Sequence, residues 1–156
     1  PGVGVGGHCI AVDPWFLVSE FKKESNLIAT VRKTNLNKTE WCLNKSLEAI
    51  ASFNIENKRL PIIACMGLSY KPDVDDLRES PAFYIANNIY NDYKENTLII
   101  EPNISEHQLF ELSTINDALE KADIIVWLVL HNEFKSLKIN KNIIQLDFIG
   151  LNSKHN

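Results

Sequence analysis

The sequence predicts an α/β protein in which a long helix is followed by a Rossmann-like three-layer domain with a mainly parallel sheet. Residues 26–53 contain neither proline nor glycine, and they place apolar side chains at roughly helical spacing. After residue 59, short apolar runs alternate with helical patterns, which is typical of parallel strands covered by helices. Hydrophobic residues form 45% of the 156-residue chain, which is enough for one sizeable core.

The first two helices are predicted from their start signals and apolar spacing. Asp13 is a favourable N-cap residue, and Pro14 suits the first helical position. The second helix is expected over residues 26–53, either continuous or broken near residues 34–38. Residues 54–59 are polar and are expected to form a linker.

Strands and helices alternate in the remainder of the chain. Apolar runs predict strands over residues 61–66, 97–101, 123–130 and 143–147. Helical patterns predict helices over residues 81–93, 115–121 and 132–137. Ser80 and Pro81 supply the start signal for the first of these helices, as cap and first-turn residue. This order of strands and helices indicates a mainly parallel sheet.

Composition argues against several classes of function. The formal net charge of −4 disfavours a general nucleic-acid-binding protein. No apolar run reaches the length of a membrane span and no signal peptide is recognisable, so no membrane association is expected. The odd number of cysteines favours a reducing cytoplasm over a disulfide framework, and their spacing predicts no metal site. These cysteines are Cys9, Cys42 and Cys65.

A glycine-rich turn around Cys9 is the first candidate site. Cys9 lies four residues before the expected start of a helix, where the helix dipole favours a thiolate. Gly6 and Gly7 allow a ligand to approach the backbone closely, and His8 is a candidate base or hydrogen-bond partner. The alternative is a buried structural cysteine. The glycines of residues 2–7 match the spacing of a dinucleotide fingerprint, but they lack its strand and its immediate helix.

The segment from Gly67 to Pro81 is the second candidate site. It follows a predicted buried strand, so Lys71 and Arg78 lie on a loop at the carboxyl end of that strand. Open α/β sheets bind ligands at this edge, and cationic side chains beside a helix start suit phosphate groups. The alternative is a solvated loop in which aspartate and arginine pair with one another.

Together, the two segments resemble the UDP-glucose/GDP-mannose dehydrogenase family. The resemblance rests on PGVGVGGHCIAVDPW at residues 1–15 and on GLSYKPDVDDLRESPA at residues 67–82. It covers nearly the whole chain in order. The His8–Cys9 pair is most similar to the bacterial branch that acts on UDP-N-acetyl-hexosamines. Val12 stands where the UDP-glucose branch has lysine, which favours the same branch.

The resemblance implies that the chain is the last part of a longer enzyme. Family members have an amino-terminal NAD-binding Rossmann domain, a long central helix that builds a dimer, and a carboxyl-terminal domain that binds the nucleotide sugar. Residues 1–57 would hold the end of the active-site segment and the dimerisation helix, and residues 58–156 the UDP-sugar-binding domain. The chain alone is expected to form homodimers. It is expected to be inactive, because the family's Rossmann domain and catalytic lysine and asparagine lie upstream.

The resemblance also implies a reaction and a role for each matching residue. Family members oxidise the sugar C6 hydroxyl to a carboxylate with two NAD, here expected on UDP-N-acetylmannosamine. Cys9 matches the nucleophile that forms a thiohemiacetal and then a thioester, and a thioester is a good acyl donor to water. Asp13 matches the residue that positions or activates this water. The other matches are a backbone contact to substrate at Gly6, substrate contacts at Tyr70 and Lys71, and an NAD contact at Arg78.

One departure from the family pattern and two alternative functions remain. Ile149 stands where the family often has a basic substrate contact, which predicts altered diphosphate or uridine affinity, or a variant subgroup. The first alternative is a non-catalytic module for nucleotide-sugar binding or dimerisation. The second is a cysteine hydrolase that uses Cys9 and His8. Adjacent side chains in an extended turn point apart, so this pair has poor geometry for a dyad.

Overall fold

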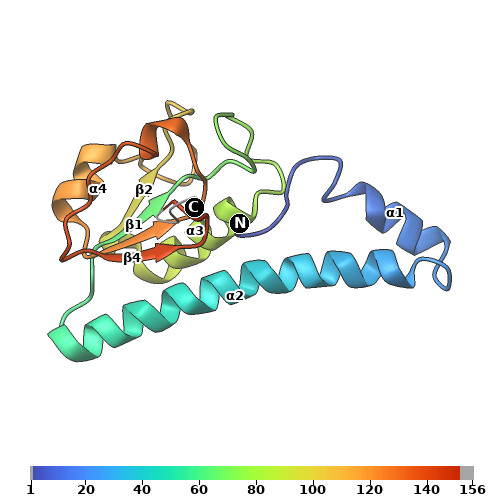
Figure 1. Cartoon of the computed structure of the whole chain (residues 1–156), viewed down its shortest axis with the longest axis horizontal. Coiled ribbons are helices and arrows are strands. Elements are labelled where there is room, and N and C mark those ends of the chain that lie inside the picture. Colours follow the sequence, from blue (N-terminus) through green and yellow to red (C-terminus); the bar gives the residue numbers. More distant parts are fainter. Residues whose placement is uncertain (1, 152–156) are drawn as a thin grey trace, which may run out of the picture.

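A computed structural model describes residues 2–151, and Figure 1 shows their arrangement. Helices and strands alternate in an α/β fold, which confirms the predicted fold class. The elements are α1 (Asp13–Glu20), α2 (Asn26–Asn57), β1 (Ile63–Met66), α3 (Pro81–Tyr93), the 3-10 helix η1 (Lys94–Asn96), β2 (Thr97–Ile100), α4 (Ile115–Lys121), β3 (Ile124–Trp127), the 3-10 helix η2 (Asn132–Phe134) and β4 (Ile144–Asp147). The predicted domain end at residue 156 lies outside the described residues.

The strands form one parallel sheet in the order β2–β1–β3–β4. Side chains alternate between its two faces, as the two-residue period of a strand requires. In β1, Ile63 and Cys65 pack with α2 and α3 on one face, whereas Ala64 and Met66 pack with α4 on the other. All four side chains are fully buried. The sheet is thus the middle of three layers, with α2 and α3 on one side (Figure 1).

The sheet has a topological switch point between β1 and β3. The chain leaves β1 for β2 on one side and later returns to β3 on the other side of β1. The connections that follow β1 and β3 therefore diverge at the carboxyl edge, where open α/β sheets bind ligands. Gly67 directly follows β1 with φ of +92°, and a Cβ there would lie 2.6 Å from the Cβ of Val129. Only glycine allows the two connections to approach so closely.

Helix α2 is continuous over its 32 residues. The break considered near residues 34–38 is absent, and the predicted linker was wrong for residues 54–57, which continue the helix. Mostly polar side chains keep these residues exposed, but they do not prevent backbone hydrogen bonds of the helix. Residues 54–57 therefore form the last turn of α2 in contact with solvent. The helix ends at Asn57, and its C-cap residue Lys58 adopts the left-handed conformation with φ of 54°.

The two halves of α2 have different surroundings. The second half packs against α3 and the sheet, and it buries Cys42, Leu43, Ile50 and Phe53. The first half stands clear of the sheet and lies beside α1 (Figure 1). Leu27 and Val31 are exposed there. This part of the molecule therefore presents apolar side chains to solvent.

Helix α1 begins at Asp13, one residue before the predicted start. Val12 occupies the N-cap position and forms no side-chain cap, so the prediction that Asp13 caps the helix was wrong. The cause is the preceding turn, in which the Cys9 carbonyl oxygen accepts the backbone N–H groups of Val12 (3.0 Å) and Asp13 (2.8 Å). This turn places Val12 in helical geometry already.

The other boundaries follow the predictions with shorter strands. Helices α3 and α4 have the predicted bounds, and Ser80 Oγ accepts the Phe83 N–H at 3.2 Å as the predicted N-cap. Strand β3 ends at Trp127, because the next two N–H groups donate to the Met66 carbonyl oxygen. The helix predicted over residues 132–137 is only the 3-10 turn η2. Within residues 2–151, no helix combines the length and hydrophobicity that a membrane crossing requires.

Candidate functional site

A pocket of about 360 Å³ lies at the carboxyl edge of the sheet, at the switch point between β1 and β3. Five segments that are far apart in the sequence form its walls. They are the N-terminal arm, the loop after β1, the start of α3, and the turns after β3 and β4. The lining residues are 2–4, 69–72, 81–82, 128–130 and 149–150. The pocket therefore lies at the edge where the sequence predicted ligand binding.

Tyr70 and Lys71 both line this pocket, on the loop that follows β1. Lys71 is exposed, and its Nζ lies 5.7 Å from the centroid of the Tyr70 ring. Lys71 forms no ion pair with any residue between 2 and 151. An uncompensated cation at the rim of a pocket suits an anionic ligand such as a phosphate group.

The N-terminal arm, residues 2–7, is fixed against α2 and against the loop after β1. Thr39 Oγ1 donates to the Val3 carbonyl oxygen at 2.9 Å. Asn35 binds both backbone groups of Val5, at 2.8 and 3.1 Å. The Gly7 N–H donates to the Arg78 carbonyl oxygen at 3.3 Å. The fold therefore brings together the two motifs that sequence analysis singled out separately.

Gly6 is required by the protein's own packing. A Cβ at this position would lie 2.2 Å from the Glu79 carbonyl oxygen, so no other residue fits without moving the loop. Gly6 is buried and does not line the pocket, whereas Gly2 and Gly4 do. The close approach that the sequence suggested for a ligand is made here by the Glu79 backbone.

Cys9 is exposed and lies in the turn that precedes α1. Asp13 is adjacent, since its N–H donates to the Cys9 carbonyl oxygen. His8 Nδ1 lies 4.0 Å from Asp76 Oδ2, and no hydrogen bond joins His8 to Cys9 within the described residues. The exposed position disagrees with the alternative of a buried structural cysteine.

Arg78 forms a close ion pair with Asp76 on the same loop. Arg78 Nη2 lies 2.7 Å from Asp76 Oδ2. The hydrogen bonds that the Arg78 side chain and backbone N–H donate to Asp76 lower the pKa of Asp76 to about 2. Asp76 also raises the pKa of Arg78, with smaller contributions from Tyr70 and Cys9. The loop thus has the internal Asp–Arg pair considered as an alternative. The Arg78 side chain nevertheless remains 65% exposed beside the Cys9 segment.

Ile149 lines the pocket from the turn after β4 and is buried against the apolar core. Asp147 Oδ1 holds this turn by accepting the N–H groups of Ile149, Gly150 and Leu151. The position at which the resemblance led us to expect a basic contact thus forms an apolar part of the pocket wall. Lys71 is the cationic side chain that lines the pocket among residues 2–151.

A buried polar network behind the pocket was missed by sequence analysis. Glu101, just after β2, and His131, between β3 and η2, are both buried, and Glu101 Oε2 lies 3.0 Å from His131 Nε2. Burial raises the pKa of Glu101, but hydrogen bonds from His131, Leu68 and Asn103 outweigh this effect and lower it to about 2. At both positions the sequence offered one signal, a polar residue directly after an apolar run.

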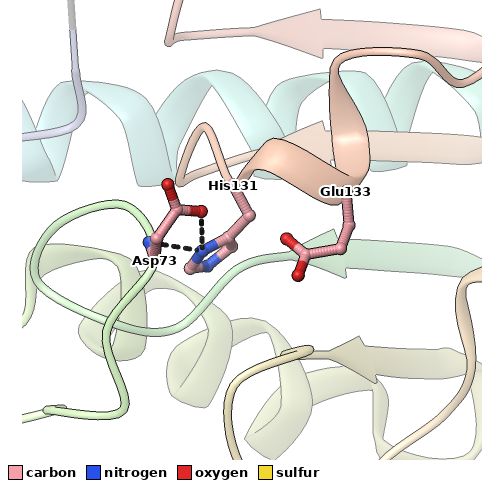
Figure 2. A group of neighbouring side chains, drawn as sticks. All are labelled: Asp73, His131 and Glu133. Atoms are coloured by element: carbon pink, nitrogen blue, oxygen red, sulfur yellow. Dashed lines mark hydrogen bonds and ion pairs between the residues drawn. The ribbon is translucent and has the colours of Figure 1, made fainter.

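Asp73 and Glu133, both exposed, lie on either side of His131, as Figure 2 shows. Asp73, His131 and Glu133 offer potential metal-ligand atoms within 4.8 Å of one another. However, His131 Nδ1 already accepts the Asp73 N–H at 3.0 Å, and Nε2 faces Glu101. Both ring nitrogens are therefore committed to hydrogen bonds, and the cluster is better described as a hydrogen-bond network than as a metal centre.

The fold and the pocket define a Rossmann-like domain with a pocket at its switch point. The model of the UDP-glucose/GDP-mannose dehydrogenase family, UDP binding domain, matches residues 64–148. The chain belongs to this family.

Curated relatives and solved structures agree with this assignment. The chain is 44% identical over 145 residues to UDP-N-acetyl-D-mannosamine dehydrogenase of Salmonella typhi, covering 88% of this chain and 34% of the relative. It is 41% identical to NDP-N-acetyl-D-galactosaminuronic acid dehydrogenase of Ralstonia nicotianae, covering 90% and 33%. The UDP-D-ManNAc dehydrogenase structure from Pyrococcus horikoshii matches with a TM-score of 0.73 and 35% identity, covering 88% and 32%. The chain thus spans about a third of the length of these relatives.

Proposed function

We propose that this chain is the nucleotide-sugar-binding part of an NAD-dependent UDP-sugar 6-dehydrogenase and that it carries the catalytic cysteine. The observation that carries the proposal is the switch-point pocket, with Tyr70 and Lys71 in its wall. The loop that carries them also accepts a hydrogen bond, at Arg78, from Gly7, two residues before Cys9. The proposed substrate is UDP-N-acetylmannosamine, after the names of the relatives from Salmonella and Pyrococcus. Residues 1–57 are proposed to supply the active-site and dimerisation segment, and residues 58–156 the UDP-sugar-binding domain.

The pocket has features that suit UDP. Its volume of about 360 Å³ falls within the range of small-ligand sites. Pro81, Val129 and Ile149 give it apolar walls against which a uracil ring can pack. Lys71 supplies positive charge at the rim for the diphosphate. Tyr70, which lines the pocket, is proposed as a further substrate contact. Gly6 does not line the pocket, so its proposed contact to the substrate is a backbone contact beyond the pocket wall.

Removal of the Lys71 charge is expected to weaken UDP binding about tenfold or more, because a hydrogen bond to a charged group contributes about 1.5–3 kcal/mol. The measurement is calorimetric titration of the chain with UDP, comparing wild type with Lys71→Ala. Lys45→Ala is the matched control, since Lys45 is an exposed lysine of α2 that pairs with Glu48 outside the pocket. Equal affinities of Lys71→Ala and wild type would argue against UDP in this pocket.

Cys9 Sγ is the proposed nucleophile. As a thiolate it adds to the C6 aldehyde, and the resulting alkoxide takes up a proton to give a thiohemiacetal. Loss of a hydride from C6 and of the hydroxyl proton to solvent then gives a thioester, which water hydrolyses to the carboxylate and the free thiol. NAD, when bound, accepts hydride in each oxidation, so two are used per sugar. Asp13, adjacent to Cys9 in the turn, is proposed to position the attacking water.

Arg78 is the proposed NAD contact within this chain. Its exposed guanidinium, held by Asp76 beside the Cys9 segment, fits an anionic group of the cofactor. Residues 2–151 hold no strand–GxGxxG–helix unit, so the main NAD-binding domain is proposed to lie elsewhere in the longer enzyme. The chain alone is therefore expected to form no NADH from any UDP-sugar. An absorbance assay at high chain concentration checks this, with the longer enzyme as the positive control.

A second copy of the chain is the proposed partner of α1 and the first half of α2. Apolar side chains are exposed on both helices, including Phe16, Leu27 and Val31. Arg32 is only 7% exposed, and its Nε has no hydrogen-bond partner among residues 2–151. A buried unpaired polar group is costly, and exposed apolar side chains favour association. The face formed by α1 and the first half of α2 is therefore proposed to be covered by a second copy of the chain in a homodimer. Trp41 is a weaker candidate for the interface, because it already packs on Phe148.

Val31→Glu is expected to convert a homodimer to a monomer at micromolar concentration, because it places a charge in the centre of the proposed apolar interface. Light scattering of both proteins measures the mass. Ile55→Glu is the control, since Ile55 is an exposed aliphatic side chain near the opposite end of α2. A wild-type chain that is strictly monomeric would contradict dimerisation through this helix.

The alternative function is a non-catalytic nucleotide-sugar-binding or dimerisation module. It is favoured by one observation, namely that the described residues contain the pocket but no dinucleotide-binding loop. Only the dehydrogenase function requires Cys9, so substitution of Cys9 distinguishes the two functions. The cytoplasm is the proposed compartment in either case, because Cys9, Cys42 and Cys65 are free thiols.

A further inference from the structure

Behind the pocket, Glu101 and His131 connect the segments that follow the carboxyl ends of three strands, β1, β2 and β3. Glu101 is 4% exposed and His131 is fully buried. Glu101 Oε2 accepts the N–H groups of Leu68 at 2.7 Å and Ser69 at 3.1 Å, where the chain leaves β1. Neither Glu101 nor His131 lines the pocket. A buried carboxylate and a buried imidazole are costly unless they are fully hydrogen-bonded. Their hydrogen bonds therefore indicate what these two side chains do in the fold.

The hydrogen bonds assign the tautomer of His131. Its Nδ1 accepts the Asp73 N–H at 3.0 Å and therefore carries no proton. Nε2 then holds the hydrogen and donates it to Glu101 at 3.0 Å. The result is a chain of donated hydrogen bonds that runs from the backbone of the loop after β1, through an imidazole after β3, to a carboxylate after β2.

Asp73 completes a clasp between the loop and the turn after β3. Its carboxylate accepts the Asn132 N–H at 2.9 Å and the Asn132 side-chain amide at 2.6 Å. Asp73 also has φ of 60°, a conformation that is uncommon for residues other than glycine and that these contacts maintain. The loop is therefore fixed at two points, at Ser69 by Glu101 and at Asp73 by His131 and Asn132.

The pocket wall lies between these two fixed points. Residues 70–72 line the pocket, and residues 69 and 73 on either side of them carry the anchoring hydrogen bonds. We propose that Glu101 and His131 are positioning residues that preset Tyr70 and Lys71 for the diphosphate of a nucleotide sugar. The loop is then ordered before the ligand arrives, so the entropic cost of ordering it does not reduce affinity. This inference rests on the proposed function of the pocket as a UDP site.

The test compares two replacements of His131 by calorimetric titration with UDP. His131→Phe keeps a ring but removes the hydrogen bonds of both ring nitrogens, including those to Asp73 and Glu101. It is expected to weaken UDP binding about tenfold, the effect of losing a preorganised site. His131→Gln offers an oxygen to the Asp73 N–H and an amide hydrogen to Glu101, so it is expected to restore affinity to within about threefold. Ser46→Ala is the control, because it removes a buried hydrogen bond within α2, away from the pocket.

A double-mutant cycle with Lys71 separates positioning from general destabilisation. If His131 acts through Lys71, His131→Phe should cause less than about twofold further loss in the Lys71→Ala background. Full additivity of the two losses, or unchanged UDP affinity of His131→Phe, would overturn the inference. Asp73→Gly extends the test should His131→Phe fail to fold. It removes the clasp carboxylate from an exposed residue with positive φ, and the same non-additivity is expected.

Hydrogen exchange without ligand distinguishes this inference from the proposed function. Backbone amides of residues 70–73 are expected to exchange faster in His131→Phe than in wild type, and at the wild-type rate in His131→Gln. Unchanged exchange in His131→Phe would reject the positioning role. If the wild-type chain binds no UDP, the proposed function fails, whereas the exchange measurement still decides whether His131 orders the loop.

Discussion

Replacing Cys9 by alanine in the longer enzyme is expected to abolish formation of the sugar acid while leaving UDP-sugar affinity within about twofold. The reason is that the proposed thiohemiacetal and thioester both need the Cys9 sulfur, whereas the thiol acts only after the substrate has bound. Turnover is measured as acid produced, and affinity by calorimetric titration with UDP-N-acetylmannosamine. Near-normal acid production by Cys9→Ala would reject the proposed mechanism.

Cys42→Ala is the control for this substitution, and alkylation provides an independent check. Cys9 is exposed, whereas Cys42 and Cys65 are buried. Burial raises the pKa of Cys42, and it raises the pKa of Cys65 to about 12, so both thiols react slowly. Brief iodoacetamide treatment of the longer enzyme should therefore label Cys9 first. Preferential labelling of either buried cysteine would contradict this order.

Gly67→Ala is expected to destabilise the chain by about 2–5 kcal/mol, which combines overpacking and backbone strain. Gly67 has φ of +92°, and the new Cβ would lie 2.6 Å from the Cβ of Val129 and 3.1 Å from its backbone nitrogen. The contact lies between the connections after β1 and β3, so relief requires these connections to separate. For a chain of this size, the melting temperature should fall by roughly 5–15 °C, as measured by circular dichroism.

Gly2→Ala provides the matched control for the added methyl group. A Cβ at Gly2 would meet no atom within 4 Å, so its melting temperature should remain within about 2 °C of wild type. Gly67→Ala with wild-type stability would mean that the two connections can move apart freely. In that case the switch-point pocket would be much less rigid than its packing indicates.

The sequence predicted those elements that are defined by local signals. Helices α3 and α4 have the predicted bounds. Ser80 caps α3 as predicted, and a side-chain cap acts within one helical turn. The Thr114 cap of α4 is seen only in the structure. The α/β class followed from the alternation of apolar runs with helical patterns. One error arose where two local signals compete, at Asp13, where the Cys9 carbonyl oxygen starts the helix one residue before the expected cap.

The candidate site was predicted only in part. Lys71 was recognisable, because a loop after a strand must lie at the carboxyl edge of a parallel sheet, whereas Tyr70 was indicated only by the resemblance to the family. Glu101 and His131 were missed, because each is a lone polar residue after an apolar strand. Their role depends on a contact between residues 30 positions apart. The Asp73–His131 bond joins residues 58 positions apart, and no local pattern encodes such a pair.

The sequence by itself determined the α/β class, the order of the elements and the two motifs, since periodicity, caps and turns depend on neighbouring residues. Only the tertiary structure decided that the N-terminal arm, which leads to Cys9, lies against the loop that carries Arg78. It also decided that the Glu79 backbone occupies the space where a side chain at Gly6 would lie. These contacts depend on how the arm packs on α2 and on the loop after β1. Close packing between distant segments, rather than local conformational preference, therefore shapes the pocket.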